Sequence, residues 1–205
     1  MLVAIFGIDG SGKTTAGKGL SAHLKSHSID AQYVKLVDAN TPFVDYYKLL
    51  VEEDARFAGD GVAQNYAFAF ERHRTAETLL KPLLQRHDIV VLDRYVHCDI
   101  AYSDARGRPS EMYDRLLDHV PQVDVGFVMD LPVEAAMTRV TLRGEPIWTF
   151  QENLDLLARV REQYLNVASR FGFTVIDAER DRESIVSIMC EKLRSHPAFN
   201  LKMSA

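Results

Sequence analysis

Eight residues near the amino terminus combine glycines, a lysine and a hydroxyl side chain at the spacing of a phosphate-binding loop. The segment Gly7 to Thr14 (GIDGSGKT) fits the pattern G-x-x-x-x-G-K-[ST] and directly follows a short apolar run. Glycines let the backbone curl so that consecutive N–H groups face a phosphate, and a following helix adds its positive dipole end. Lys13 would then contact β- and γ-phosphate oxygens, and the Thr14 hydroxyl would ligate Mg²⁺.

A carboxylate and a guanidinium stand side by side at the end of another apolar run. Ile89 to Leu92 is followed by Asp93 and Arg94. The carboxyl end of a parallel strand faces the ligand crevice, so Asp93 is placed to hold Mg²⁺ or its water shell. Arg94 offers a planar fork for a second phosphate or carboxylate. In the alternative interpretation, these two side chains pair with each other across a loop.

A third group of residues lies on one side of a predicted long helix, Val62 to Arg86. Asn65, Phe68 and Arg72 recur at i, i+3 and i+7, which puts an amide, an aromatic ring and a guanidinium on a shared face. This trio suits a planar, anionic ligand, because a base stacked on an aromatic ring gains roughly 1–3 kcal/mol. The alternative is that Phe68 belongs to the core.

The elements that must position these residues are visible in the hydrophobic pattern. Five apolar runs are continuous rather than alternating, which is typical of strands buried on both faces. Helical stretches separate them, and this order predicts an α/β fold: three α/β/α layers around a five-stranded parallel sheet. The runs are Leu2 to Phe6, Gln32 to Val37, Ile89 to Leu92, Val123 to Met129 and Phe173 to Ile176.

Length and composition limit the class of protein. The chain has 205 residues, 47% of them hydrophobic, which suits a single domain over residues 1–205. Its net charge of −5 provides no basic field for a nucleic acid polymer, and the apolar opening is too short to enter a membrane. Cys98 and Cys190 are too far apart for a metal knuckle and fit the reducing cytoplasm. Without metal-ligand spacing, four histidines are expected on the surface or in loops: His73, His87, His97 and His119.

Taken together, these motifs resemble the thymidylate kinase family of P-loop nucleoside monophosphate kinases over nearly the whole chain. The resemblance implies a P-loop kinase fold with a short lid at about residues 143–150, and a dimer of identical subunits. Its carriers are Gly7 to Thr15, Phe68 to Arg72 (FAFER), Asp93 to Tyr95 with Ala101-Tyr102, Asp130 to Glu134 (DLPVE), Arg139 and Arg143-Gly144.

The resemblance also implies roles for individual residues. Asp9 would face the acceptor sugar, Phe68 would stack on its base, and Tyr102 would lie near its 2′ side. The acceptor site then comprises Asp9, Asn65, Phe68, Arg72, Arg94 and Tyr102. ATP would be bound by Gly7, Asp9, Gly10, Ser11, Gly12, Lys13, Thr14, Thr15, Arg139 and Arg143, with the adenine near Ala178 and Glu179. The catalytic residues would be Lys13, Asp93, Arg94 and Arg143, and the Mg²⁺ ligands Thr14 and Asp93.

The chain departs from the family pattern at three places. Residues 37–42 (VDANTP) lack the arginine of the usual Arg-Glu-Pro stretch. Counting without gaps, Trp148 replaces a lid arginine, and Ser103 stands where a glutamine often helps to read the base. These changes bear on the acceptor more than on the kinase chemistry.

The predicted function is ATP-dependent phosphoryl transfer to a nucleoside monophosphate, with dTMP as the first candidate acceptor. One alternative is a kinase for another nucleotide or for a nucleoside hydroxyl, in which Asp9 or Asp93 would accept the proton. Another is a nucleotide-binding switch without turnover. Tyr66 and Phe70 point away from Phe68, toward either the core or a neighbouring subunit.

Overall fold

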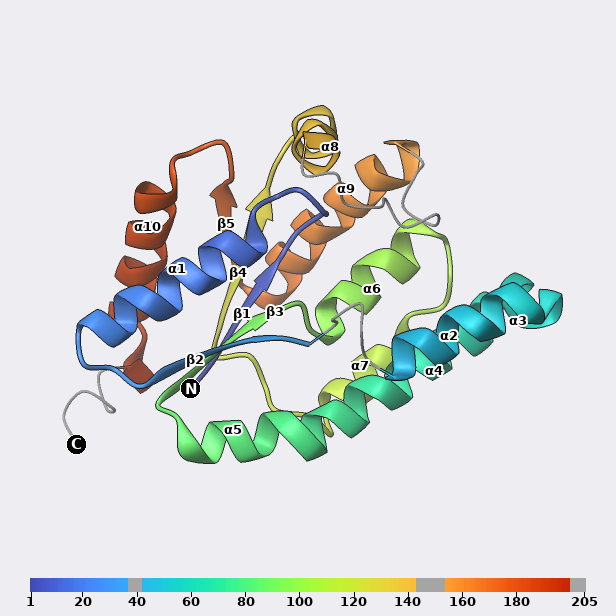
Figure 1. Ribbon diagram of the computed structural model, residues 1–205, viewed down its shortest axis with the longest axis horizontal. Coiled ribbons are helices and arrows are strands. Elements are labelled where there is room, and N and C mark those ends of the chain that lie inside the picture. The colour runs from blue at the N-terminus through green and yellow to red at the C-terminus, as the bar shows by residue number, and fades with distance from the viewer. Residues whose placement is uncertain (37–41, 143–153, 200–205) are drawn as a thin grey trace.

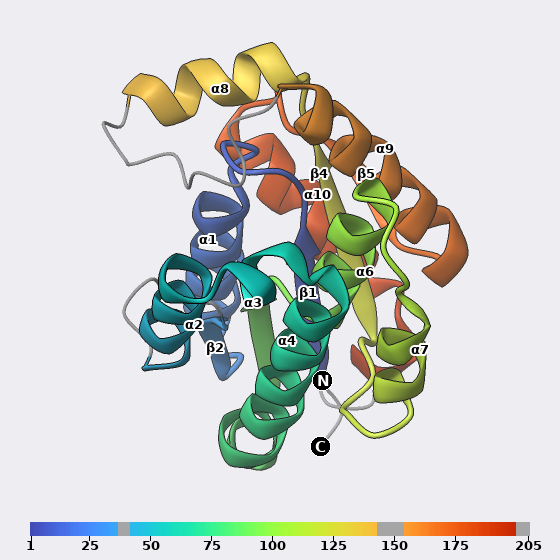
Figure 2. The same cartoon turned by 90° about the vertical axis from the view of Figure 1, so that its right-hand side faces the viewer.

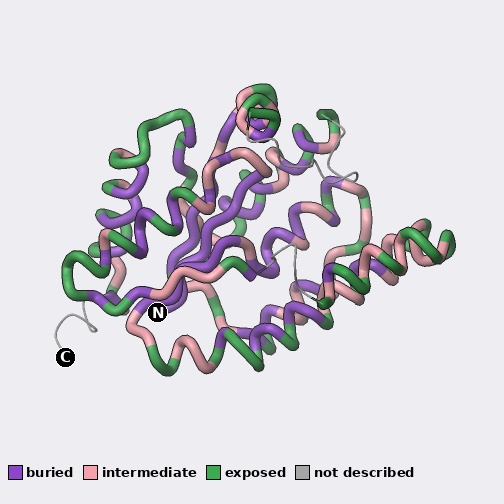
Figure 3. The backbone as a smooth tube through the Cα atoms, in the orientation of Figure 1, coloured by how far each residue is buried: buried purple, intermediate pink, exposed green. Residues whose placement is uncertain are grey.

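The sheet has five strands, all parallel, in the order β2-β3-β1-β4-β5. The computed structural model describes residues 1–36, 42–142 and 154–199. The three central strands, β1, β3 and β4, are buried on both faces, and Figure 3 shows this buried centre. The edge strands β2 and β5 are only partly buried, because each has a neighbouring strand on one side only. The strands are β1 (Leu2–Phe6), β2 (Ala31–Lys35), β3 (Ile89–Asp93), β4 (Val125–Asp130) and β5 (Thr174–Asp177).

Helices connect the strands and cover both faces of the sheet (Figures 1 and 2). Helices α1 and α10 pack against each other on one face, while α6, α9 and the α4 to α5 stretch lie on the other. The predicted three-layer α/β/α architecture is therefore confirmed. The helices are α1 (Lys13–Ser26), α2 (Pro42–Glu53), α3 (Ala55–Gly59), α4 (Gly61–Thr75), η1 (Ala76–Leu80), α5 (Lys81–Arg86), α6 (Val96–Ala105), α7 (Glu111–Leu117), α8 (Val133–Leu142), α9 (Leu154–Phe171) and α10 (Arg182–Arg194).

The predicted long helix is present as one continuous helical stretch, residues 61–86, in which a π-helical turn separates α4 from α5. Asp60 caps its start by accepting hydrogen bonds from the backbone N–H groups of Val62 and Ala63. Pro82, just after the π turn, cannot donate a backbone hydrogen bond to residue 78, which favours a widened turn at this point.

The order of the strands decides where a ligand can bind. Strand β1 is central, with β3 on one side and β4 on the other. The chain therefore switches from one half of the sheet to the other at β1, next to the segment that follows this strand. Ligands of open α/β sheets bind at this point, outside the carboxyl ends of the strands. The glycine-rich segment and the start of α1 lie there. The predicted lid, residues 143–150, falls outside the described residues.

Candidate active site

Three glycines give the loop between β1 and α1 its shape. Gly7, Gly10 and Gly12 have φ angles of 137°, 85° and 87°, a region that side chains rarely adopt. A Cβ at Gly10 would also lie 2.3 Å from the carbonyl oxygen of Ala136 in α8. The loop is thus held tightly against α8 and curls as a phosphate cradle requires.

Lys13 lies at the first position of α1 and is buried, with 7% of its side chain exposed. Its Nζ donates a 2.7 Å hydrogen bond to the carbonyl of Ile8 and lies 3.6 Å from Asp9. Burial, followed by the nearby charge of Arg94, lowers the pKa of Lys13. The ammonium group is held inside the curve of the loop, where a phosphate would satisfy it.

Asp93 ends β3 directly beside the loop, in register with Ile5 of β1. Its Oδ2 accepts hydrogen bonds from the Thr14 hydroxyl at 2.5 Å and the Tyr33 hydroxyl at 3.0 Å. Its Oδ1 is buried and has no hydrogen-bond partner in the part of the chain that the structure describes. A buried carboxylate oxygen without a partner, next to a threonine hydroxyl, is the donor set that a hard cation such as Mg²⁺ takes. The residues present therefore fit this ion.

The Ser11 hydroxyl is a second unpartnered polar group in the loop. It is fully buried and forms no hydrogen bond with any of the described residues. Buried polar groups are normally paired, so this donor is free for an oxygen of a bound molecule. Its position agrees with the predicted phosphate cradle.

Arg94 pairs with Asp9 of the loop rather than with its neighbour Asp93. Its Nη2 donates to Asp9, and its Nη1 lies 3.3 Å from the hydroxyl of Tyr164 in α9. Burial alone would lower the pKa of Arg94, but the charge of Asp9 outweighs burial and the pKa is raised. Arg94 has a φ of 72°, a backbone conformation that is costly for a side chain of this size. The site therefore holds a permanent cation in a strained position opposite the loop.

Phe68 and Arg72 share a face of α4, as the spacing predicts. The guanidinium carbon of Arg72 lies 5.8 Å from the centre of the Phe68 ring. Phe68 is half-buried and also contacts Phe43 and Tyr47 of α2, at centroid distances of 5.5 and 4.8 Å. Arg72 forms two hydrogen bonds with Asp99 of α6, at 2.6 and 2.9 Å.

Asn65, the third member of this face, is engaged within the protein. Its side-chain amide donates to the carbonyl of Pro109 at 3.0 Å and accepts from the Ser103 hydroxyl at 3.2 Å. These bonds tie α4 to α6 and to the segment before α7. The acceptor role predicted for Asn65 stays a prediction, because its amide already has both a donor and an acceptor partner.

Tyr102, which the resemblance places near the acceptor sugar, lies beside two arginines in the structure. Its ring centre is 5.8 Å from the guanidinium carbon of Arg94 and 5.2 Å from that of Arg106. Tyr164 packs edge-on against it, with 6.2 Å between ring centres. Arg94, which directly follows β3, and Tyr102, in α6, therefore lie close together.

On the opposite side of the loop, Arg139 of α8 donates two hydrogen bonds of 3.1 Å to the carbonyl of Ala178. The structure thus joins Arg139, a predicted ATP-binding residue, to the segment around Ala178 that the resemblance places near the adenine. Thr15 is exposed on the first turn of α1. Arg143 and Trp148 lie outside the described residues.

Three polar residues of the site escape sequence reasoning: Tyr33, Asp99 and Tyr164. Tyr33 looks like an ordinary strand residue, and Tyr164 fits the core spacing of its helix. Asp99 lies 27 positions from Arg72, and no local pattern links them. Each contacts a predicted site residue, and only the packing of the elements reveals it.

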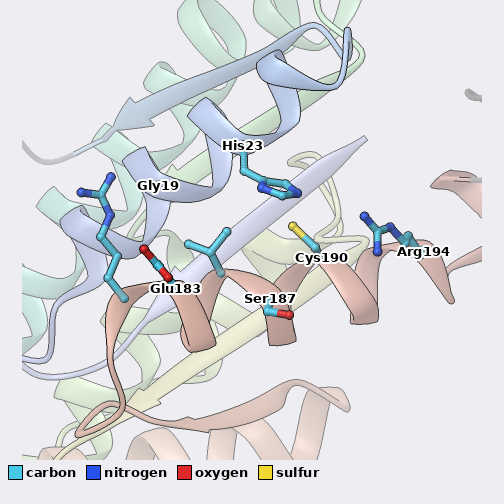
Figure 4. Close-up of a pocket in the computed structure, with 8 residues that line it drawn as sticks. Gly19, His23, Glu183, Ser187, Cys190 and Arg194 are labelled. Carbon is cyan, nitrogen blue, oxygen red and sulfur yellow. The ribbon is translucent and has the colours of Figure 1, made fainter.

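A hollow of about 540 Å³ lies elsewhere, between α1 and α10. Figure 4 shows His23 and Cys190 facing each other across it, with Arg194 at one end. It is lined by residues from Gly19 onward along α1 and contains no residue of the loop. We therefore place the candidate active site at the loop and not in this hollow.

Fold and site together define a P-loop nucleotide-binding protein, with a glycine loop after the central strand and a carboxylate at the end of the next. Among the residues that the structure describes, no group of three histidine, cysteine or acidic side chains could hold a metal ion. None of the described helices is long and apolar enough to cross a membrane.

Comparison with known proteins identifies the family. Residues 5–188 match the profile of the thymidylate kinase family, so the chain belongs to this family. It is 32% identical to "Probable thymidylate kinase 1" of Saccharolobus solfataricus over 90% of this chain and 92% of the relative. It is 30% identical to "Probable thymidylate kinase" of Pyrococcus abyssi (93% and 96% covered) and 32% identical to "Thymidylate kinase" of Xanthomonas oryzae pv. oryzae (91% and 79% covered).

Proposed function

We propose that this protein is an ATP-dependent nucleoside monophosphate kinase that phosphorylates dTMP to dTDP. Family membership supports the reaction, and three relatives named above carry the name thymidylate kinase. The observation that carries the proposal is the hydrogen bond from Thr14 to Asp93 beside the unpartnered Oδ1 of Asp93. This arrangement suits a metal-bound triphosphate in the loop.

On the donor side, the loop residues Gly7 to Thr15 would bind the phosphates of ATP. Lys13 would exchange its hydrogen bond to the Ile8 carbonyl for phosphate oxygens, and the Ser11 hydroxyl would gain the partner it lacks. The pairing of Arg139 with Ala178 supports an adenine site at this end of the sheet. Arg139 would then form part of the wall of that site.

On the acceptor side, Phe68 would stack on the base while Arg72 contacts it. Arg94 would bind the acceptor phosphate, because it lies at the loop edge and its partner Asp9 is one-third exposed and can turn to the sugar. Tyr102, close to Arg94, would pack against the sugar. Asn65 would support the acceptor site indirectly, because its hydrogen bond with Ser103 holds α4 against α6.

Charge explains why these residues suffice for the reaction. Phosphoryl transfer passes through a loose transition state, which asks the protein for positioning and positive charge. A monophosphate acceptor has a second pKa near 6 and is largely ionised at neutral pH, so no strong general base is required. Lys13 and Arg94, which both lie next to Asp9, would counter the repulsion between the two polyanions.

Thr14 and Asp93 would hold Mg²⁺ in this site. The ion would supply additional positive charge between the β- and γ-phosphates. Tyr33 supports this role, since its hydrogen bond occupies Oδ2 of Asp93 and leaves Oδ1 open.

We further propose that residues 1–205 form one kinase domain whose lid spans about residues 143–150. Arg143, at the start of the lid, would add a catalytic guanidinium over the phosphates. Losing a transition-state arginine typically costs about 10³–10⁵ in rate. Lid closure would also exclude water and limit ATP hydrolysis.

The proposal also includes a homodimer in the cytoplasm, acting on nucleotides and on no nucleic acid polymer. Val62, Tyr66 and Phe70 form an exposed apolar stripe along α4, at i, i+4 and i+8. Because Tyr66 and Phe70 are exposed, they do not belong to the core. The stripe suits contact with a second subunit. Two free, buried thiols, Cys98 and Cys190, agree with a reducing compartment. Light scattering should give a dimer mass for the wild type and a monomer mass for Tyr66→Glu; a wild-type monomer would contradict the dimer.

An ATP-coupled assay against nucleosides and their monophosphates tests the activity directly. We expect dTMP to be the best acceptor and nucleosides without phosphate to be inactive. Phosphorylation of a nucleoside in preference to every monophosphate would replace this proposal with a hydroxyl kinase. Nucleotide binding without turnover of any acceptor would indicate a switch.

A further inference from the structure

The hydroxyl of Tyr33 reaches the proposed metal site from β2, a strand that contains none of the predicted site residues. Tyr33 is paired with Val91 of β3, two residues before Asp93. Side chains two positions apart on a strand point to the same face of the sheet, so Tyr33 and Asp93 lie on one face. The 3.0 Å hydrogen bond from Tyr33 to Oδ2 of Asp93 therefore joins two neighbouring strands.

Packing against α1 fixes the position of the Tyr33 ring. A Cβ on Gly17 would lie 2.8 and 3.0 Å from two carbons of this half-buried ring, so the glycine lets α1 come this close. The Nζ of Lys18 lies 5.9 Å from the ring centre and adds a cation–π contact. Gly17 follows Thr14 by three residues, on the same side of α1. The helix that supplies Thr14 to the site therefore also holds Tyr33.

The hydrogen bonds of Asp93 occupy one of its carboxylate oxygens completely. A carboxylate oxygen accepts hydrogen bonds at roughly two lone-pair positions. Oδ2 has two donors, the hydroxyls of Thr14 and Tyr33, whereas Oδ1 is buried and has no partner in the described part of the chain. Asp93 can therefore contact a cation, or a water molecule bound to that cation, through Oδ1 alone. Both donors are neutral, so the carboxylate also keeps its full negative charge.

The number of oxygens that a carboxylate offers affects Mg²⁺ and Ca²⁺ differently. Mg²⁺ is small and requires near-ideal octahedral coordination, which a single oxygen per carboxylate satisfies. Ca²⁺ is larger, takes more oxygen ligands and accepts a carboxylate through both oxygens. A carboxylate whose second oxygen is blocked by two hydroxyl donors therefore suits Mg²⁺ better than Ca²⁺.

We propose that Tyr33 is a positioning residue that restricts Asp93 to one available oxygen and thereby makes the nucleotide site selective for Mg²⁺ over Ca²⁺. The inference rests on the proposed function and adds a residue and a metal selectivity to it. Without the Tyr33 hydroxyl, one lone-pair position of Oδ2 is open and the carboxylate can offer both oxygens to one cation. Ca²⁺ gains from this second oxygen, whereas Mg²⁺ loses the fixed orientation of the first.

Tyr33→Phe tests the proposal, because it removes the hydroxyl and keeps the ring that packs against Gly17. Binding is measured without turnover, on protein loaded with the non-hydrolysable analogue β,γ-imido-ATP. Electron paramagnetic resonance follows the bound Mn²⁺ while Mg²⁺ or Ca²⁺ is added as competitor, which gives a dissociation constant for each ion. We expect the variant to lower the ratio of the Ca²⁺ constant to the Mg²⁺ constant about tenfold, since contacts behind a metal ligand typically change metal affinity about 10- to 100-fold.

Tyr95→Phe is the matched control. Tyr95 is buried, and its hydroxyl donates a bond of the same length, 3.0 Å, to the backbone carbonyl of Pro121 instead of to a carboxylate. This control should keep the wild-type ratio of the two constants. The free analogue also binds these ions, but it does so equally in every titration, and its contribution cancels when a variant is compared with the wild type.

Two results overturn the proposal in distinguishable ways. If Tyr33 only packs β2 against α1, Tyr33→Phe changes both constants by the same factor and their ratio matches the wild type. Tyr33 then has no role in metal selectivity, and the proposed kinase function stands. If the loaded wild-type protein binds no more Mn²⁺ than the analogue alone, the metal site of the proposed function is refuted, and the role of Tyr33 with it.

Discussion

The Thr14 hydroxyl donates a 2.5 Å hydrogen bond to Asp93, joining the start of α1 to the end of β3 across 79 positions of sequence. This bond spans the point at which the phosphate loop and the neighbouring strand converge. Tyr33 donates to the same carboxylate oxygen, and the other oxygen has no partner among residues 1–36, 42–142 and 154–199. The Thr14 hydroxyl and the Asp93 carboxylate, which together form the proposed metal site, therefore already lie next to each other.

Thr14→Val tests this alignment with little change in side-chain volume. The variant removes both the hydrogen bond to Asp93 and a proposed Mg²⁺ ligand, so we expect the Mg²⁺ concentration for half-maximal activity to rise at least about tenfold. Titration of activity with Mg²⁺ at saturating ATP measures it. Thr78→Val, on the exposed face of η1, should match the wild type. An unchanged Mg²⁺ requirement in Thr14→Val would remove Thr14 from the metal site.

Lys13→Ala tests the phosphate cradle. Lys13 is the buried cation inside the loop, and its loss should lower kcat by about 10³-fold, since charge stabilisation dominates this chemistry. The fold should persist, because the hydrogen bond and the ion pair that the described residues show for Lys13 are both local, to Ile8 and Asp9. Lys25→Ala, at the exposed end of α1, is the control. Steady-state kinetics with circular dichroism separates the two effects, and turnover at the wild-type rate would exclude the mechanism.

Sequence reasoning captured the fold well because the fold depends on local patterns. In α9, apolar residues recur at helical spacing, and the structure buries four of them on one side: Leu157, Val160, Tyr164 and Ala168. Each predicted strand overlaps an observed one, with ends differing by at most two residues. The glycine loop was recognisable because its chemistry requires fixed residue types at fixed positions.

Partners of the charged residues were beyond the reach of the sequence. Arg94 was considered beside Asp93 but pairs with Asp9, 85 positions away. Similarly, Arg72 was placed on a ligand-binding face without its carboxylate, Asp99. A long side chain can reach many groups, and which one it meets depends on how helices pack on the sheet. Sequence spacing contains no information on that choice.

Phe68→Ala tests the base platform. Stacking on an aromatic ring is worth roughly 1–3 kcal/mol, so KM for dTMP should rise about 5- to 150-fold while KM for ATP stays the same. Phe68 also packs against Phe43 and Tyr47, and the alanine variant therefore loses stability as well. Phe68→Leu keeps most of the side-chain volume and should still raise KM for dTMP. Wild-type kinetics in both variants would assign Phe68 to packing alone.

His97 was expected at the surface, but it is 3% exposed in the first turn of α6, among the rings of Phe6, Phe171 and Phe173. Its Nδ1 has no hydrogen-bond partner, and burial lowers its pKa from 6.5 to about 3. The unfolded chain therefore binds a proton at His97 below about pH 6.5, whereas the folded protein does not bind it until about pH 3. The free energy of unfolding consequently decreases as the pH falls through this window. His97→Phe removes this proton uptake, and its drop in unfolding free energy between pH 7.5 and pH 5 should be smaller than that of the wild type by about 2 kcal/mol.

Urea denaturation at both pH values measures the difference, and comparing the change with pH cancels any constant packing cost of the substitution. Exposed His119→Phe should keep the wild-type slope, and an equal slope in His97→Phe would mean that the buried imidazole does not govern acid stability.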